Sequence, residues 1–197
     1  PLLRMVEKLE NDKIQFRLAL VMPPLLCNML SDEILQEAYV QWLNERIELG
    51  QSELKRNKSN DKIKSLVSAE IENNKKLKAD FVDKYECKLI PVFSKYMEKG
   101  YLELLGTCGT DIFLPHYADM KEIVCAQIES GLHCYRRFFG VTPEGFWLPE
   151  LGYAPGLEKI IRAYGYTYTI LDSRSILFAE KIPEVGIFYP SRTENSL

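Results

Sequence analysis

The chain has 197 residues, of which 46% are hydrophobic and 11% aromatic, enough to bury the core of one domain. Its formal net charge is only −3 and its lysines are interspersed with glutamates, so we expect no nucleic-acid partner and no membrane partner. This charge balance favours a neutral polymer or a small molecule as substrate, and no stretch approaches the roughly 20 apolar residues of a membrane-spanning helix.

The first predicted strand covers residues 16–22, an apolar run that two prolines stop. Asp32 then has a side chain suited to cap a helix, which we expect to begin near Glu33. Between residues 51 and 80 the chain is rich in Lys, Glu, Asn and Ser, with apolar residues at helical spacing. This pattern predicts a solvated amphipathic helix rather than a linker or a nucleic-acid patch.

Strands and helices alternate regularly after Gly100, a residue suited to end the preceding helix. Apolar runs predict strands over 101–105, 145–148 and 166–171, and helical spacing predicts helices over 120–139 and 157–164. Such alternation is typical of an α/β protein with a parallel sheet and crossover helices. Periodicity alone leaves open whether the sheet closes into a barrel or stays open.

Glu150 is the most informative single residue, because it follows a short apolar run at Pro149 and precedes a predicted helix. In barrels of alternating strands and helices, the C-terminal ends of the strands assemble the active site. A carboxylate there, between Trp147 and Tyr153, indicates a catalytic group in a saccharide-sized cleft. The alternative is that Glu150 caps the helix that starts near Pro155.

Three segments in order resemble conserved motifs of glycoside hydrolase family 57, which contains α-amylases, 4-α-glucanotransferases and α-glucan branching enzymes. The segment 147–158, WLPELGYAPGLE, is similar to the nucleophile motif of that family. The segment 100–115, GYLELLGTCGTDIFLP, resembles its second conserved region, and 166–172, YTYTILD, resembles the strand that ends in aspartate in branching-type members. The likeness therefore runs from about Tyr101 to Asp172.

The resemblance implies a (β/α)7-type barrel with parallel strands, present here in incomplete form. Residues 1–197 would be part of one barrel catalytic domain, with a charged helical insertion at about 51–99. The histidine motif of the family's opening strand is missing, and the acid/base aspartate is expected outside this chain, so we expect the isolated fragment to be inactive. Asp111 stands where many members have histidine, and it cannot supply a neutral imidazole donor.

The chemistry that the resemblance implies is cleavage of an α-1,4-glucan with retention of configuration, with Glu150 as the nucleophile. Retaining enzymes hold their two carboxyl groups roughly 5 to 5.5 Å apart, so the partner must come from another strand. Glu144 and Glu158 are expected to be structural, the first at the opposite end of the strand and the second on the outside of a helix. The sequence gives no reason to expect a metal or an organic cofactor.

Five residues are candidate contacts to the substrate. Trp147 offers a ring to a sugar but could instead pack in the core, whereas Tyr153 lies beyond the strand end. Asp172 ends an apolar strand and either contacts a sugar hydroxyl or serves a turn. Asp111 and His116 lie in the loop after the second motif strand, where both could bind sugar hydroxyls.

Two other functions compete with α-glucan cleavage. A metal-dependent polysaccharide deacetylase is disfavoured because His116 and His133 are too far apart in sequence for a His-x-x-x-His pair. A noncatalytic glucan-binding or regulatory relative would keep the cleft without activity, and Asp111 lends it support. Among the catalytic options a 1,4-α-glucan branching enzyme or an amylase-like enzyme fits the motifs best, while hydrolysis versus transfer and the oligomeric state stay open.

The five cysteines are odd in number and irregularly spaced, with no Cys-x-x-Cys pair. We therefore expect reduced, mostly buried thiols and a cytoplasmic protein. Cys108, just after a predicted strand, is expected to pack near the mouth of the site.

Overall fold

A computed structural model describes residues 1–57, 60–179, 182 and 186–193. The chain divides into two compact units. The first comprises residues 1–16 and 28–96, and the second comprises residues 17–27 and 97–197. The boundary between the two units falls within α2 (Pro24–Ser31). Within the described ranges, no helix combines the length and the apolar character needed to cross a membrane.

The second unit is built on four short parallel strands, β1 (Leu18–Val21), β2 (Leu102–Leu105), β3 (Gly145–Phe146) and β4 (Tyr168–Thr169). Two parallel pairs, β1 with β2 and β3 with β4, are joined by a parallel bridge between Gly106 and Phe146. The strands therefore follow one another across the sheet in chain order, as expected for successive crossover units. The α/β class and the parallel pairing are confirmed, although each strand except β2 is much shorter than its apolar run predicted.

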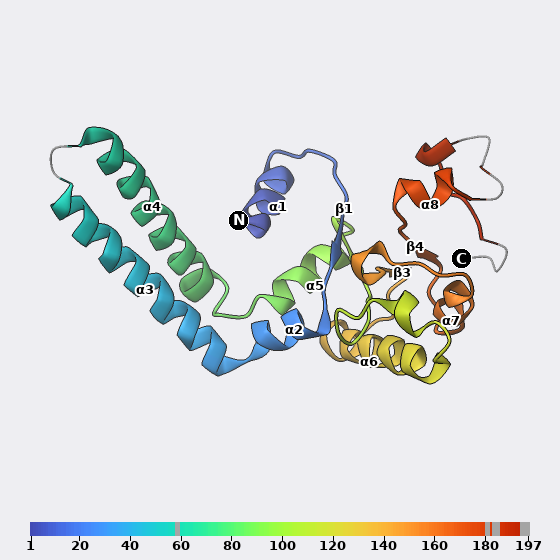
Figure 1. Cartoon of the computed structure of the whole chain (residues 1–197). Coiled ribbons are helices and arrows are strands. Elements are labelled where there is room, and N and C mark those ends of the chain that lie inside the picture. The colour runs from blue at the N-terminus through green and yellow to red at the C-terminus, as the bar shows by residue number, and fades with distance from the viewer. Residues whose placement is uncertain (58–59, 180–181, 183–185, 194–197) are drawn as a thin grey trace. The chain divides into compact units, whose positions relative to one another are not determined.

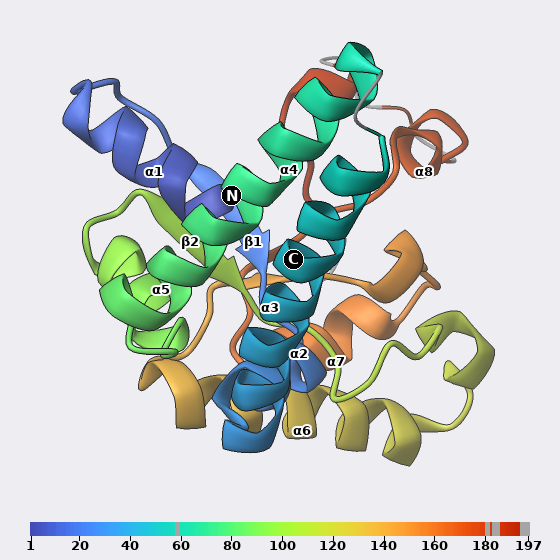
Figure 2. The same ribbon diagram turned by 90° about the vertical axis from the view of Figure 1, so that its left-hand side faces the viewer.

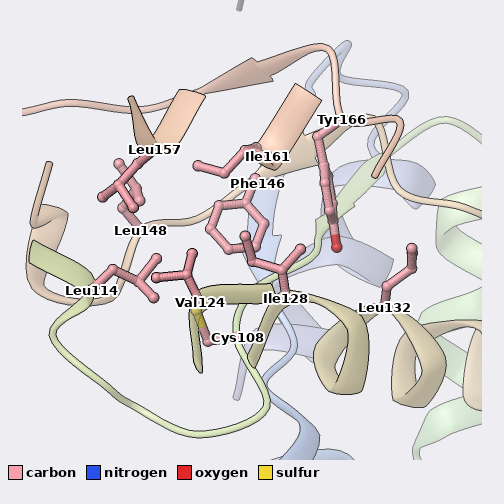
Figure 3. Packing of buried hydrophobic residues seen from close by; sticks show 10 residues of the cluster. All are labelled: Cys108, Leu114, Val124, Ile128, Leu132, Phe146, Leu148, Leu157, Ile161 and Tyr166. Atoms are coloured by element: carbon pink, nitrogen blue, oxygen red, sulfur yellow. The ribbon is translucent and has the colours of Figure 1, made fainter. Parts of the chain in front are cut away.

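Helices α6 (Lys121–Phe139) and α7 (Leu157–Ala163) cover one face of this sheet. α6 ends where Gly140 adopts φ 72°, a left-handed conformation that glycine accommodates without strain. The shorter helical segments of the unit are η2 (Leu114–Tyr117), η3 (Pro149–Leu151), α8 (Ser173–Leu177) and η4 (Gly186–Phe188). Figure 3 shows the buried cluster between sheet and helices, formed by Cys108, Leu114, Val124, Ile128, Leu132, Phe146, Leu148, Leu157, Ile161 and Tyr166.

The opposite face of the sheet has a different character. Side chains alternate across a strand, so Trp147, between the fully buried Phe146 and Leu148, lies on the face away from the helices. On that face the Tyr168 hydroxyl donates a hydrogen bond to the exposed carboxylate of Glu103. Trp147 is half-buried and does not belong to the buried cluster on the helix side of the sheet.

The first unit is helical, with α1 (Leu2–Asn11), α3 (Glu33–Arg56), α4 (Asp61–Ala79), a π-helical turn η1 (Asp80–Lys84) and most of α5 (Ile90–Glu98). Figures 1 and 2 both show α3 and α4 side by side as a hairpin. Asp32 accepts a hydrogen bond from the Leu35 N–H, which confirms the predicted cap and start of α3. The charged segment 51–80 is not one helix, because α3 ends at Arg56 and α4 begins anew after its own cap, Asn60.

All five cysteines are free thiols. Only Cys27 and Cys108 are fully buried, and the other three are half-buried, so the expectation of mostly buried thiols was too strong.

Candidate functional site

The C-terminal ends of the strands meet at one edge of the sheet in the second unit. Gly106 pairs with Phe146, and Phe146 pairs with Thr169, so β2, β3 and β4 end at the same level of the sheet. The segments that follow them, 107–111, 147–150 and 170–172, consequently leave the sheet at the same edge, which we call the strand-end edge. In parallel α/β folds this is the edge where ligands bind.

Glu150 lies at the strand-end edge in an unusual turn. Its backbone has φ 55° and ψ 19°, and Leu151 follows with φ 53°, so two successive non-glycine residues are left-handed. Such conformations cost on the order of 1 kcal/mol each and concentrate at functional sites. Two hydrogen bonds close the turn, from the Leu151 N–H to the Leu148 carbonyl (2.9 Å) and from the Gly152 N–H to the Pro149 carbonyl (3.0 Å). The Glu150 side chain is exposed.

The alternative role for Glu150 as a helix cap is wrong. Helix α7 begins at Leu157, with Gly156 as its N-cap. The Gly156 N–H instead donates to Glu158 Oε2 at 2.8 Å, and the Tyr153 hydroxyl donates to the same oxygen at 3.0 Å. These two donors explain why Glu158 is buried with 5% exposure rather than on the outside of the helix, as the sequence suggested. Glu158 therefore has a structural role, as expected. The Tyr153 hydroxyl uses its proton for this hydrogen bond to Glu158.

Thr107 ties the end of β2 to the Glu150 segment. It is one of the few buried polar residues, with 3% exposure, and its Oγ1 donates to the Trp147 carbonyl at 2.9 Å. The Trp147 N–H in turn donates to the Gly106 carbonyl at 2.7 Å. Helix α6 supports this junction closely, since a Cβ added at Gly131 would lie 1.8 Å from the Thr107 carbonyl oxygen. Sequence reasoning did not single out Thr107.

Asp111 and His116 are both exposed in the loop after β2. Gln127 of α6 anchors the start of that loop, because its Oε1 accepts from the Thr110 N–H at 3.0 Å and from the Thr110 hydroxyl at 3.1 Å. The imidazole of His116 packs edge-on against Phe113, with 4.9 Å between ring centroids. Phe113, which sequence reasoning missed, is 38% exposed.

Cys108 packs as expected beneath this loop, with 1% exposure. Burial, and secondarily the charge of Asp111, raises the pKa of its thiol to about 12. The thiol is therefore protonated at neutral pH and acts as a packing group rather than a nucleophile.

Asp172 has its carboxylate oxygens occupied. It is the N-cap of α8, accepting from the Arg174 N–H at 2.9 Å, and it pairs with the Arg174 guanidinium at 2.8 and 3.1 Å. The side-chain hydrogen bond from Arg174, helped by the backbone one, lowers the pKa of Asp172 to about 2. This arrangement favours the turn alternative for Asp172 over a contact to a sugar hydroxyl.

A groove of about 820 Å³ lies beside Tyr153 in the second unit. Its walls come from β4 and the segment after it, including Tyr168, Ile170 and the largely exposed rings of Phe188 and Tyr189. A groove with aromatic walls suits a ligand that is flat and partly apolar. Among the described residues, no three or more His, Cys, Asp or Glu side chains are grouped in a way that could hold a metal ion.

Comparisons with known proteins point to one enzyme family. The sequence profile described as Glycosyl hydrolase family 57 matches residues 5–197. The chain is 26% identical over 191 residues to a 1,4-alpha-glucan branching enzyme of Thermococcus kodakarensis, covering 89% of the chain and 28% of that enzyme. It therefore spans well under a third of the length of this relative.

Two solved structures share the fold. The alpha-amylase AmyC of Thermotoga maritima aligns with a TM-score of 0.91 and 32% identity, over 100% of the chain and 37% of AmyC. A GH57-type branching enzyme of Pyrococcus horikoshii aligns with a TM-score of 0.82 and 23% identity, over 89% of the chain and 36% of that enzyme, and supports the fold alone.

Proposed function

The chain belongs to glycosyl hydrolase family 57, and from that premise we propose that it carries the nucleophile of a retaining enzyme that cleaves α-1,4-glucans. The observation that carries the proposal is Glu150, an exposed carboxylate in a strained turn at the strand-end edge. A left-handed backbone in a glutamate has a cost that a purely structural turn would avoid with glycine.

In the proposed reaction, Glu150 attacks the anomeric carbon while a second carboxyl group protonates the departing glycosidic oxygen. A covalent glycosyl-enzyme forms. Water or a sugar hydroxyl then gives its proton to the second carboxyl group, now ionised, and displaces Glu150 with retention of configuration. Asp172 is unsuited to the role of acid, because its lowered pKa keeps it ionised near neutral pH. We propose that the acid/base residue lies outside this chain, on a later strand of a (β/α)7-type barrel.

The glucan is proposed to run along the strand-end edge. Asp111 and His116 are exposed there and can bond sugar hydroxyls, while Trp147 and the ring of Tyr153 offer apolar faces. The groove that Tyr153 and Tyr189 line offers further room for the glucan. Since the relatives include both an alpha-amylase and a branching enzyme, we propose an activity of one of these two kinds. The free thiols support our further proposal that the protein works in the reducing cytoplasm.

The decisive experiment compares the full-length protein that carries this sequence with its Glu150→Gln variant on amylose. Reducing ends and iodine staining are followed together. We expect Glu150→Gln to lose more than about 1000-fold in turnover, because the amide cannot act as nucleophile. Its melting temperature should stay close to that of the parent, since the side-chain volume hardly changes.

Glu144→Gln is the matched control, because Glu144 is exposed and precedes β3 at the opposite end of the strand. It should keep full activity. Reducing ends that rise in step with lost staining would identify an amylase, and lost staining with few new ends a branching enzyme. Retained activity in Glu150→Gln would refute the assignment, and no activity in the parent would favour a noncatalytic glucan binder.

A further inference from the structure

Phe113 is an exposed aromatic ring on a rigid support. Its side chain is 38% exposed, whereas Leu114, the next residue, is completely buried in the cluster of Figure 3. The Phe113 carbonyl accepts from the His116 N–H at 3.2 Å, which starts the turn of η2. The buried anchor and the turn hold the Phe113 backbone in place, so its ring is presented to solvent at little cost in conformational entropy.

The ring is in direct contact with the Glu150 turn. A Cβ added at Gly152 would lie 2.5 Å from Cε2 and 2.8 Å from Cδ2 of Phe113, and 3.1 Å from Cδ of Pro115. Only a glycine permits this approach, because any side chain would push the ring away. Since Gly152 is two residues after Glu150, the ring lies against the segment that carries the proposed nucleophile.

A polar group accompanies the ring. The His116 imidazole is exposed and packs edge-on against Phe113 at 4.9 Å, so its nitrogens can meet a hydroxyl bound at the rim of the ring. A pyranose ring has one face of C–H groups and an equatorial belt of hydroxyls. An aromatic face with a hydrogen-bonding group at its rim matches both features.

We propose that Phe113 and His116 form a glucose-binding subsite beside Glu150. This inference rests on the proposed α-glucan activity and deepens it by naming where one sugar ring is held. Phe113 packs against the C–H face of that ring, His116 bonds one of its hydroxyls, and Gly152 sets the distance between the subsite and Glu150.

The test measures binding of maltoheptaose by titration calorimetry to the full-length Glu150→Gln protein, in which turnover cannot consume the ligand. Adding Phe113→Ala should weaken binding about tenfold, and Phe113→Leu should weaken it similarly because it keeps volume without a flat face. Phe113→Tyr should bind within about twofold of the parent. Met120→Ala is the control, since Met120 is a 52% exposed apolar residue at the far end of the same loop and should have no effect.

The outcomes separate the subsite from the proposed function. Unchanged affinity in both Phe113→Ala and Phe113→Leu would overturn the subsite, even if Glu150→Gln abolishes turnover as expected. Full turnover in Glu150→Gln would instead refute the assignment of Glu150 as nucleophile. The maltoheptaose affinities of the Phe113 variants would then test the subsite independently. If circular dichroism shows that Phe113→Ala melts at a lower temperature than the parent, the affinities of Phe113→Leu and Phe113→Tyr are compared instead. Equal affinities of these two variants would overturn the subsite. Absence of any maltoheptaose binding would overturn the subsite outright.

Discussion

The α3–α4 hairpin and the strand-end edge differ in backbone geometry, which is regular in the hairpin and strained at the edge. In the hairpin each helix starts at a capping side chain, Asp32 or Asn60, and the side chain of Ile71 in α4 packs against Gly50 in α3. At the strand-end edge, backbone approaches backbone and Glu150 is left-handed. The difference indicates that the hairpin is built for stability with regular geometry, whereas the edge holds strained geometry in place for chemistry.

The largest expected effect comes from changing a helical glycine to alanine in each region. At Gly131 the new Cβ would lie 1.8 Å from the Thr107 carbonyl oxygen, a backbone atom that cannot move aside. We expect Gly131→Ala to lower the free energy of unfolding by about 3 kcal/mol, measured by urea denaturation.

Gly50→Ala in α3 is the contrasting variant. Its Cβ would meet Cγ1 of Ile71 at 2.5 Å, but that side chain can rotate. The gain in helix propensity of about 1 kcal/mol should offset much of the clash. Equal losses at Gly50 and Gly131 would contradict the view that close backbone contact distinguishes the strand-end edge.

The next effect concerns the buried hydroxyl of Thr107. Thr107→Val keeps the shape of the side chain but leaves the Trp147 carbonyl without its 2.9 Å partner. A loss of about 2 kcal/mol in unfolding free energy is expected, because an unsatisfied buried acceptor costs that much. Thr107→Ser retains the donor and should recover most of the loss. Similar losses for Val and Ser would attribute the effect to packing instead.

Much of this architecture could be predicted from local patterns. The apolar runs that contain β1 to β4, the cap at Asp32 and the placement of Glu150 at a strand end all depend on neighbouring residues. Phe113 was missed because its contact with the Glu150 turn is made through Gly152, which is distant in sequence. The burial of Glu158 was missed for a related reason, since it requires the hydroxyl of Tyr153 to fold back onto α7.

Replacing an exposed residue by glycine should have a smaller effect on the free energy of unfolding, stabilising at the strand-end edge and destabilising in the hairpin. At Glu150 the φ of 55° suits glycine, so Glu150→Gly should be more stable than Glu150→Gln by about 1 kcal/mol. At Gln51, exposed within α3, the same change should destabilise by about 1 kcal/mol. Urea denaturation measures both. Destabilisation by Glu150→Gly would show that the turn stores no strain.

The smallest effect is the pH dependence of the Asp172–Arg174 pair. The folded pKa of Asp172, about 2, lies below its ordinary value of 3.8, so the ionised carboxylate stabilises the fold. That stabilisation is fully present above pH 3.8 and is lost as the pH falls toward 2. Because the pair is exposed, Asp172→Asn should lower the free energy of unfolding only slightly at pH 6 and even less at pH 3. Urea denaturation of the parent and the variant measures both differences. An Asp172→Asn difference that grows on acidification would contradict the pairing, and it would return Asp172 to the list of groups free to meet a sugar at the strand-end edge.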